Sequence, residues 1–195
     1  MNRGFAKTFI ISILFVFTSI VISFPPSTAL SSSPSWEFGE NICRGRLLAD
    51  GEYFKAMKEA LEGARNEIVM SFFLFKTNGY RGSYPDMILS RLIAAAKRGV
   101  KVKIILEQEK NQSSMITRSN IETAKRLRRG GIEVLFDSPK TKTHTKVAVI
   151  DRRYVFLGSH NLTSSALKYN HELSFIIDSP KMAREALDYI NELDR

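Results

Sequence analysis

The apolar residues of this chain gather, from about residue 42 onward, into short runs that alternate with amphipathic segments. Runs of strand length, rich in Val, Ile and Phe, predict β-strands at residues 41–48, 68–75, 100–107, 132–136 and 171–177. Segments with apolar residues spaced by three and four predict helices at residues 52–64, 86–98, 117–129 and 180–193. Asp50 is the expected N-cap of the first of these helices, and Gly99 and Gly130 are expected to follow the ends of the next two.

The stretch HTKVAVIDRRYVFLGSHN, residues 144–161, predicts two further strands, 144–150 and 155–159. A symmetric turn of two or four residues would pair His144 with Asn161 and Lys146 with Ser159. Residues two apart in a strand share a face, so all four polar side chains would then emerge together. A three-residue turn would instead shift the register and separate them.

The order of these elements predicts the fold class. Strands alternate with helices over the first two thirds of the chain, and adjacent strands follow. This order is typical of an α/β protein with a mixed β-sheet flanked by helices on both faces. We expect residues 41–195 to form one domain, and the sequence shows no internal repeat.

The first 29 residues have the pattern of a secretory signal peptide. Arg3 and Lys7 precede an apolar run over residues 8–24, and small residues follow at positions 27–29. The run is about 17 residues, the short limit for a spanning helix, so an uncleaved membrane anchor is the alternative. A Pro- and Ser-rich linker is expected at residues 30–40. The domain would then be exported, to the periplasm or the extracellular space, or anchored in a membrane with the domain outside the cytoplasm.

The charge of the chain favours an anionic partner. It has 29 Lys and Arg against 20 Asp and Glu, a formal net charge of +9. Removing residues 1–29 removes two cations and no acids, which leaves 27 against 20, or +7. Nucleic acid and an anionic lipid surface both fit this charge. Cys43 is the only cysteine and there are three histidines, so neither an intrachain disulfide nor a four-ligand zinc site is expected.

The polar residues of the 144–161 stretch suit one kind of chemistry. Lys146 supplies a positive charge, while Ser159 and Asn161 supply neutral hydrogen bonds. A histidine such as His144 can serve as nucleophile, acid or base near neutral pH. This set fits a phosphate diester, whose non-bridging oxygens need donors.

The spacing of these residues resembles the signature of the phospholipase D superfamily. The matching pattern is His144-x-Lys146-x4-Asp151-x6-Gly158-Ser159-x-Asn161, followed by Asn170-x-Glu172. The resemblance implies a phospholipase D-like sandwich and a phosphodiesterase that needs no metal or other cofactor. It also implies that His144 is the nucleophile or the general acid. Lys146 and Asn161 would hold phosphate oxygens, with Ser159 supporting them.

The same resemblance gives roles to three further residues. Glu172 would accept the second N–H of the imidazole and fix its tautomer. Asp151 would be a structural partner at the turn, within the catalytic motif, and Gly158 would allow close approach of the backbone to substrate.

The reaction implied by the resemblance needs two imidazoles, one to attack phosphorus and one to protonate the leaving oxygen. The chain carries one copy of the motif, and the family's solution for such members is a homodimer with one composite site. His160 and His171 alternate away from the expected site, so we expect them at the surface or in a supporting role.

Three substrate hypotheses follow. The first is a non-specific endonuclease that cleaves DNA or RNA, as small bacterial endonucleases of the superfamily do. The second is a phospholipase acting on anionic phospholipid, because a mitochondrial membrane-anchored member has been argued to act on lipid. The third is a nucleic-acid binder without catalysis, which the complete motif disfavours.

Other features have a functional and a plain interpretation. Lys140 and Lys142, just before the motif, are either phosphate contacts or surface lysines. The loop at residues 76–84 contains aromatic and basic residues, which suits single-stranded nucleic acid but is also compatible with a plain surface loop. The basic residues at 97–103 and 125–129 are expected on solvated faces, and the phenylalanines of 72–75 in the core.

Overall fold

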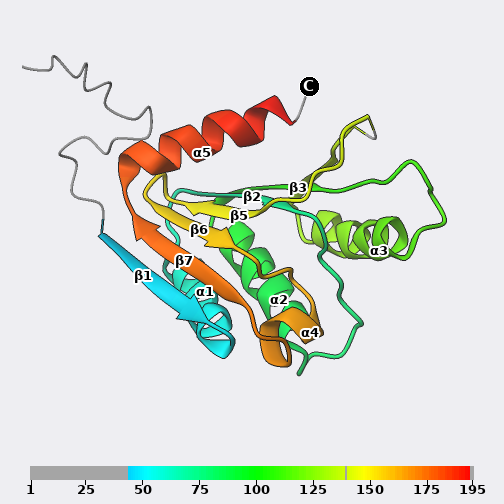
Figure 1. Ribbon diagram of the computed structural model, residues 1–195, viewed down its shortest axis with the longest axis horizontal. Helices are drawn as coiled ribbons and strands as arrows, with labels where there is room; N and C mark the ends of the chain where they lie inside the picture. The colour runs from blue at the N-terminus through cyan, green and yellow to red at the C-terminus, as the bar shows by residue number, and fades with distance from the viewer. Residues whose placement is uncertain (1–43, 139, 194–195) are drawn as a thin grey trace, which may run out of the picture. The chain divides into compact units, whose positions relative to one another are not determined.

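The computed structural model describes residues 44–138 and 140–193 and shows a seven-stranded mixed sheet with helices on both faces (Figure 1). The strands are β1 (Arg44–Ala49), β2 (Glu67–Phe72), β3 (Lys101–Leu106), β4 (Glu133–Phe136), β5 (Lys146–Ile150), β6 (Tyr154–Gly158) and β7 (Leu173–Asp178). The helices are α1 (Gly51–Gly63), α2 (Tyr84–Lys97), α3 (Met115–Arg129), α4 (Ser164–Lys168) and α5 (Pro180–Glu192). The predicted fold class is confirmed.

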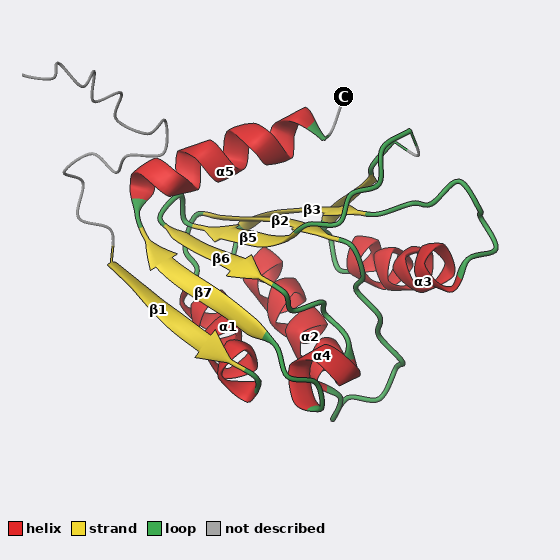
Figure 2. Ribbon diagram, in the orientation of Figure 1, coloured by secondary structure: helices red, strands yellow, loops and turns green. Residues whose placement is uncertain are grey.

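The strands lie in the order β1-β7-β6-β5-β2-β3-β4. The β2–β3 and β3–β4 pairs are parallel, and α2 and α3 provide the crossovers that parallel neighbours require. All other neighbours are antiparallel. Figure 2 shows α5 on one face of the sheet and α1 and α2 on the other.

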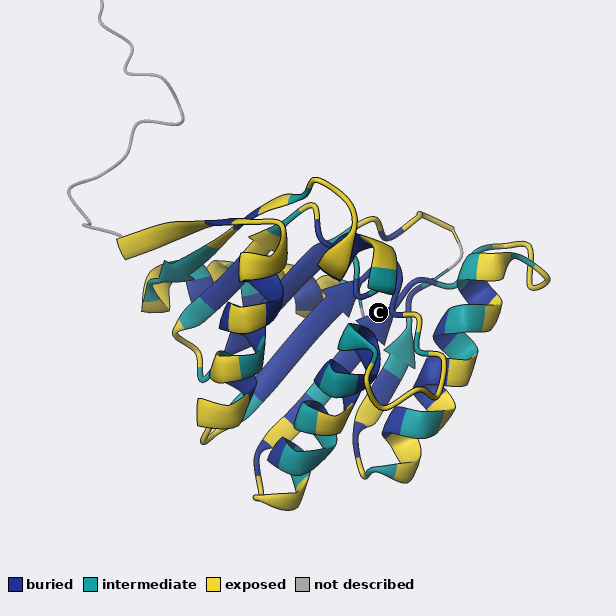
Figure 3. Cartoon of the chain, turned by 90° about the horizontal axis from the view of Figure 1, so that it is seen from below, coloured by how far each residue is buried: buried dark blue, intermediate teal, exposed yellow. Residues whose placement is uncertain are grey.

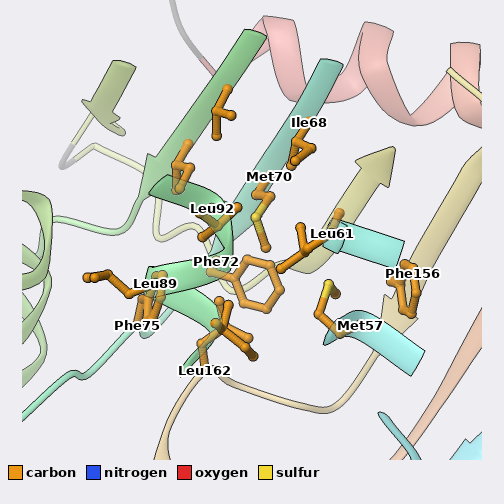
Figure 4. Packing of buried hydrophobic residues seen from close by; sticks show 14 of the residues in the cluster. Met57, Leu61, Ile68, Met70, Phe72, Phe75, Leu89, Leu92, Phe156 and Leu162 are labelled. Carbon is orange, nitrogen blue, oxygen red and sulfur yellow. The ribbon is translucent and has the colours of Figure 1, made fainter. Parts of the chain in front are cut away.

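Each face of the sheet has its own hydrophobic core. The larger core lies under α1 and α2, where Met57, Leu61 and Phe72 pack with Phe156 (Figure 4). The smaller core lies under α5, which covers β2, β5 and β6 through residues such as Leu187. The inner strands are accordingly buried while β1 is largely exposed (Figure 3).

Four helices, α2 to α5, have an N-terminal cap in which a serine or threonine side chain accepts a backbone N–H of the first turn. These capping residues are Ser83, Ser114, Thr163 and Ser179. Asp50 lies at the predicted N-cap position of α1, but it does not cap the helix with its side chain. Asp50 has a φ of 47° and its side chain makes no capping bond. Its carboxylate instead accepts the Glu172 backbone N–H at 2.9 Å, so it ties α1 to the start of β7. The short helix α4 was not predicted, because five residues are too few to show a period.

The predicted register of the β5–β6 hairpin is also wrong. Val147 pairs with Leu157 and Ile150 with Tyr154, so the turn has three residues, 151–153, and the pairing is offset by one. Asp151 and Arg152 have φ values of 53° and 54°, a left-handed conformation that tightens the turn. The Asp151 carboxylate fixes it by accepting the backbone N–H groups of residues 65–67 at 2.7 to 3.2 Å.

The predicted signal peptide or anchor (1–29) and the linker (30–40) lie outside the described residues. Within residues 44–138 and 140–193, the helices are all too short or too polar to cross a bilayer.

Candidate active site

The motif described above places its polar residues at one edge of the sheet. β2 and β6 end at this edge, whereas β5 and β7 begin there, because β5 and β7 run antiparallel to β2 and β6 respectively. His144 and Lys146 lie at the start of β5, Ser159 follows the end of β6, and Glu172 precedes β7.

Lys146 is buried, with 7% of its surface exposed, and its Nζ donates to the backbone carbonyl of His144 at 2.8 Å. Burial lowers the pKa of Lys146, and the nearby Glu172 carboxylate opposes this effect. The lysine therefore places a partly desolvated ammonium group directly behind the residue that carries the imidazole.

The His144 side chain is exposed at the sheet edge. Partial burial lowers its pKa below the ordinary value of 6.5, and the positive charges of Lys146 and Lys142 lower it further. The imidazole is therefore mostly neutral at neutral pH, which is the form that can attack an electrophile.

Phe73 is a member of the site that the sequence did not reveal. We expected it in the core, but it follows the end of β2 and is only half-buried. Its ring centroid lies 4.5 Å from that of His144, and the Nζ atoms of Lys146 and Lys142 lie 5.2 and 5.7 Å from it. The ring is thus an apolar support shared by three polar side chains.

Glu172 is fixed by its neighbours in the same chain. Its carboxylate accepts the Ser159 hydroxyl proton and the Asn170 side-chain N–H, the latter at 3.0 Å. Ser159 in turn accepts the backbone N–H of Leu173 at 3.0 Å. Among the described residues of one chain, no hydrogen bond joins Glu172 to His144, so the expected contact is not formed within a single chain. Glu172 instead interacts electrostatically with Lys146.

Asn161 lies beside this group with an unsatisfied hydrogen-bonding atom. Its side-chain oxygen is buried and has no partner in the described part of the chain. An unpaired buried amide oxygen is costly, and because it is an acceptor it is available to an incoming hydrogen-bond donor.

Two predicted site residues, Asp151 and Gly158, have structural explanations in this fold. Asp151 is at the far end of β5, about 17 Å from Lys146 at the usual strand rise. Its contacts are with the backbone before β2. At Gly158, a Cβ atom would lie 2.2 Å from the Ser174 hydroxyl oxygen. Glycine is therefore required there for packing of β6 against β7.

The loop that leads to His144 is held by acidic residues. The buried Glu107 accepts the Thr143 backbone N–H at 2.6 Å, and burial raises the pKa of this carboxyl. Lys142 pairs with Glu109 at 2.6 Å, which raises the pKa of the lysine. Lys140 is exposed on the same loop, and in the described part of the chain it makes no contact with the His144 imidazole.

The two remaining histidines are not part of this group. His160 is fully buried, stacks on Tyr53 with centroids 4.3 Å apart, and contacts the Ser174 hydroxyl at 2.7 Å. Burial lowers its pKa. His160 was expected at the surface or in a supporting role, and the structure places it in the core. His171 is exposed and lies 3.4 Å from the Asp50 carboxylate. In the described residues, no three His, Cys, Asp or Glu side chains are grouped to hold a metal ion.

Comparison with known proteins relates the chain to curated and solved proteins. It is 31% identical over 133 residues to a phospholipase D of Rickettsia prowazekii, covering 68% of this chain and 58% of that protein. It is 28% identical over 131 residues to the polyphosphate kinase of Escherichia coli K12, covering 64% of this chain and 19% of that protein. The chain therefore spans less than two thirds of the length of these curated relatives.

The crystal structure of Nuc, a phospholipase D family member from Salmonella typhimurium, superposes with a TM-score of 0.65. The two chains are 26% identical, and the match covers 78% of this chain and 94% of Nuc. The family model described as "Cardiolipin synthase, PLD-like domain" matches residues 57–193. The chain therefore belongs to the phospholipase D superfamily, a superfamily of phosphodiesterase hydrolases.

Proposed function

We propose that the protein is a phosphodiesterase that cleaves DNA or RNA with little sequence preference, through a phosphohistidine intermediate and without a metal ion. The observation that carries the proposal is the pairing of an exposed, neutral His144 with the buried ammonium group of Lys146 at the same sheet edge. The net charge of +9 supports an anionic polymer as substrate.

The side chains support a two-step displacement. A neutral His144 nitrogen attacks phosphorus, the bond from phosphorus to the leaving oxygen breaks, and a second, protonated imidazole donates its proton to that oxygen. The second imidazole then takes a proton from water, whose oxygen attacks phosphorus and releases His144. In this proposal the Lys146 ammonium group and the Asn161 side-chain N–H groups donate to the non-bridging oxygens, and Ser159 and Glu172 hold the edge in place.

The second imidazole comes, in this proposal, from a second copy of the chain. His160 is engaged in the core, and His171 lies outside the candidate site near the Asp50 carboxylate, so we do not assign either as the partner of His144. A homodimer with two-fold symmetry would bring two copies of His144 to one phosphate.

An exposed apolar face beside His144 supports this dimer. Helix α5 packs mainly on β2, β5 and β6, and part of the same face of the sheet beyond it remains exposed. There Leu47, Phe175 and Leu157 lie in register across β1, β7 and β6, each with 47% of its surface exposed. Three aligned apolar residues facing water favour burial against another surface, and the second copy is the occupant we propose.

The alternative substrate is an anionic phospholipid. A cavity of about 330 Å³ lies beside His144 and Lys146, with apolar walls that include Leu157 and Met182. Such a cavity suits an acyl chain, and the rickettsial relative is named a phospholipase D. We also propose that the protein is exported or membrane-anchored, which depends on residues 8–24 and not on the described domain.

One experiment separates these functions. The full-length protein is treated with EDTA and incubated with plasmid DNA, single-stranded oligonucleotide, RNA and cardiolipin vesicles. The nuclease proposal predicts cleavage of nucleic acid that persists in EDTA and is lost in His144→Ala. His171→Ala, which removes an exposed histidine outside the site, is the matched control and should retain cleavage.

Headgroup release from the vesicles without cleavage of nucleic acid would support the phospholipase instead. Cleavage that disappears with EDTA and returns with a divalent metal would contradict the proposed mechanism.

A further inference from the structure

A small cavity with aromatic walls lies outside the candidate active site. The loop after β2 and helix α4, which Figure 2 shows close together, enclose about 210 Å³. The lining residues are Asn78, Tyr80, Gly82, Ser83, Tyr84, Ser164, Lys168 and Tyr169. None of these eight residues is acidic, and the cavity contains no part of the motif discussed above.

Two of the lining residues are unusually exposed. Tyr169 has 72% and Tyr80 has 70% of its surface exposed, the highest values among the large apolar side chains that the structure describes. Exposed aromatic rings that gather at one concave place mark binding sites more often than plain surface. The two rings therefore indicate a ligand with a flat apolar face.

Tyr80 is held in position by its loop. Its backbone N–H donates to the Asn78 side chain at 2.9 Å, and its ring lies so close to Gly82 that a Cβ there would be 2.8 Å from it. The buried Asp86 accepts the backbone N–H groups of Asn78 and Gly79, both at 3.1 Å, and pairs with Arg126 at 2.5 Å. The backbone of the loop that carries Tyr80 is thus held in place, which reduces the entropy that the loop loses on binding.

A cation completes the cavity. The Nζ of Lys168 lies 5.1 Å from the Tyr169 ring and 6.0 Å from the Tyr84 ring. Tyr84 is itself stacked on Phe54, with centroids 3.9 Å apart, so the lysine rests on a rigid aromatic support. Aromatic rings next to a lysine suit a ligand that combines a base with a phosphate.

The cavity is within reach of the catalytic edge. Tyr169 is three residues before Glu172, so their Cα atoms are at most about 11 Å apart. That distance corresponds to about three stacked nucleotides at 3.4 Å each. The loop that carries Asn78 and Tyr80 is also tied to the segment that carries Asn161, because the Lys76 backbone N–H donates to the Leu162 carbonyl at 3.0 Å. A strand with one phosphate at the sheet edge that carries Glu172 can therefore place a base a few nucleotides away in the cavity.

We infer that this cavity is a subsite for an unpaired nucleobase of single-stranded nucleic acid, with the base stacked against Tyr80 and Tyr169 and a neighbouring phosphate bound by Lys168. The inference rests on the proposed function and specifies its substrate class. In a duplex the bases are stacked and paired inside the helix, so they do not reach the cavity without unpairing. The cavity is concave, which favours a single base as its ligand. Aromatic side chains that insert into a membrane project from a convex protein surface instead.

The test measures binding by the full-length His144→Ala protein, which does not degrade its ligand. Fluorescence anisotropy is recorded with a labelled single-stranded oligonucleotide and with the same sequence as a duplex. Tyr80→Ala and Tyr169→Ala should each weaken single-strand binding by about tenfold, because one stacked base is lost, while duplex binding changes by less than about twofold. Tyr80→Phe and Tyr169→Phe keep the rings and should bind as the parent protein does.

Gly82→Ala gives an independent perturbation, because the added methyl group displaces the Tyr80 ring without removing it. It should weaken single-strand binding and leave the duplex unaffected. An equal loss for both forms of DNA, or no loss in any alanine variant, would overturn the subsite. The same holds if the tyrosine variants lose binding to cardiolipin vesicles while oligonucleotide binding is unchanged.

The failure of the subsite and of the proposed function are distinguishable. Cleavage of nucleic acid that depends on His144 but not on either tyrosine removes the subsite and leaves the function. Tyrosine-dependent binding of single strands without any His144-dependent cleavage removes the function and leaves the subsite.

Discussion

Replacement of Asp151 separates a structural role from a catalytic one. Asp151 belongs to the superfamily motif, yet its carboxylate accepts backbone N–H groups of Arg65, Asn66 and Glu67, at the opposite end of β5 from His144. Asp151→Ala leaves three donors without their partner and places alanine at a φ of 53°. A hydrogen bond to a charged group contributes about 1.5–3 kcal/mol, but these donors are near solvent and regain water, so we expect a total loss of about 3 kcal/mol.

Asp151→Asn is the matched control. Oδ1 accepts all three N–H groups, whereas Oδ2 contacts only Arg65, so an asparagine oxygen in the Oδ1 position retains most of the arrangement. Asparagine also tolerates a left-handed φ. A loss of about 1 kcal/mol is expected for this variant.

The assay combines thermal unfolding with the rate of nucleic-acid cleavage. A loss of 3 kcal/mol corresponds to a fall in Tm of about 6–12 °C for a domain of this size. Well below both unfolding midpoints, the cleavage rates of the two variants should remain within about threefold of the parent. An unchanged Tm together with abolished cleavage in Asp151→Ala would refute the structural role.

Three further predictions follow. Gly158→Ala should destabilise the domain by about 1–3 kcal/mol in urea unfolding, because the added Cβ atom would clash with β7. Gly45→Ala on β1 is the control, since a Cβ atom there has no neighbour closer than 3.6 Å and should not destabilise the domain. Equal losses of stability would contradict the packing argument. Burial lowers the pKa of His160, so as the pH drops the unfolded chain takes up a proton on this residue before the folded chain does. The free energy of unfolding should therefore fall below about pH 6.5, by at most about 1.4 kcal/mol per pH unit. His160→Gln should show a flatter dependence on pH over this range, and an identical slope would exclude His160 as the cause. Lys142→Gln removes a positive charge near His144 and should raise the His144 pKa toward 6.5, measured by NMR titration; a fall or no change would contradict the electrostatic account.

The sequence predicted the elements because their signals are local. Each long helix presents an apolar stripe to one face of the sheet, and the buried strands are continuous apolar runs, so periodicity alone located them. Glycines such as Gly99, with a φ of 92°, marked helix ends for the same reason. The fold class then followed from the order of the elements.

The errors arose where distant residues decide the local conformation. Nothing between 151 and 154 signals a three-residue turn, and its left-handed residues are held by the backbone of 65–67, far away in the sequence. Asp50 has the residue type and position of a helix cap, but its carboxylate accepts the backbone N–H of Glu172, just before β7. His160 is buried only because Tyr53 and Ser174 converge on it.

The candidate site was predicted in composition but not in geometry. His144, Lys146, Ser159 and Glu172 do gather at one edge, although not through the face-to-face pairing that we expected. They meet because all lie at strand ends of the same sheet edge, with Lys146 as the first paired residue of β5 and the other three just outside the strands. Phe73 was missed because an aromatic residue beside a buried strand is indistinguishable in sequence from a core residue.

The most direct test of the proposed mechanism is a mixing experiment with active and inactive subunits. Parent protein and His144→Ala are unfolded together, refolded in varying proportions and assayed for nucleic-acid cleavage. If one site needs the imidazoles of two subunits, activity falls with the square of the parent fraction and equals about one quarter at equal proportions. Activity that falls in direct proportion to the parent fraction, to about one half at that point, would show that each subunit acts alone and would contradict the composite site.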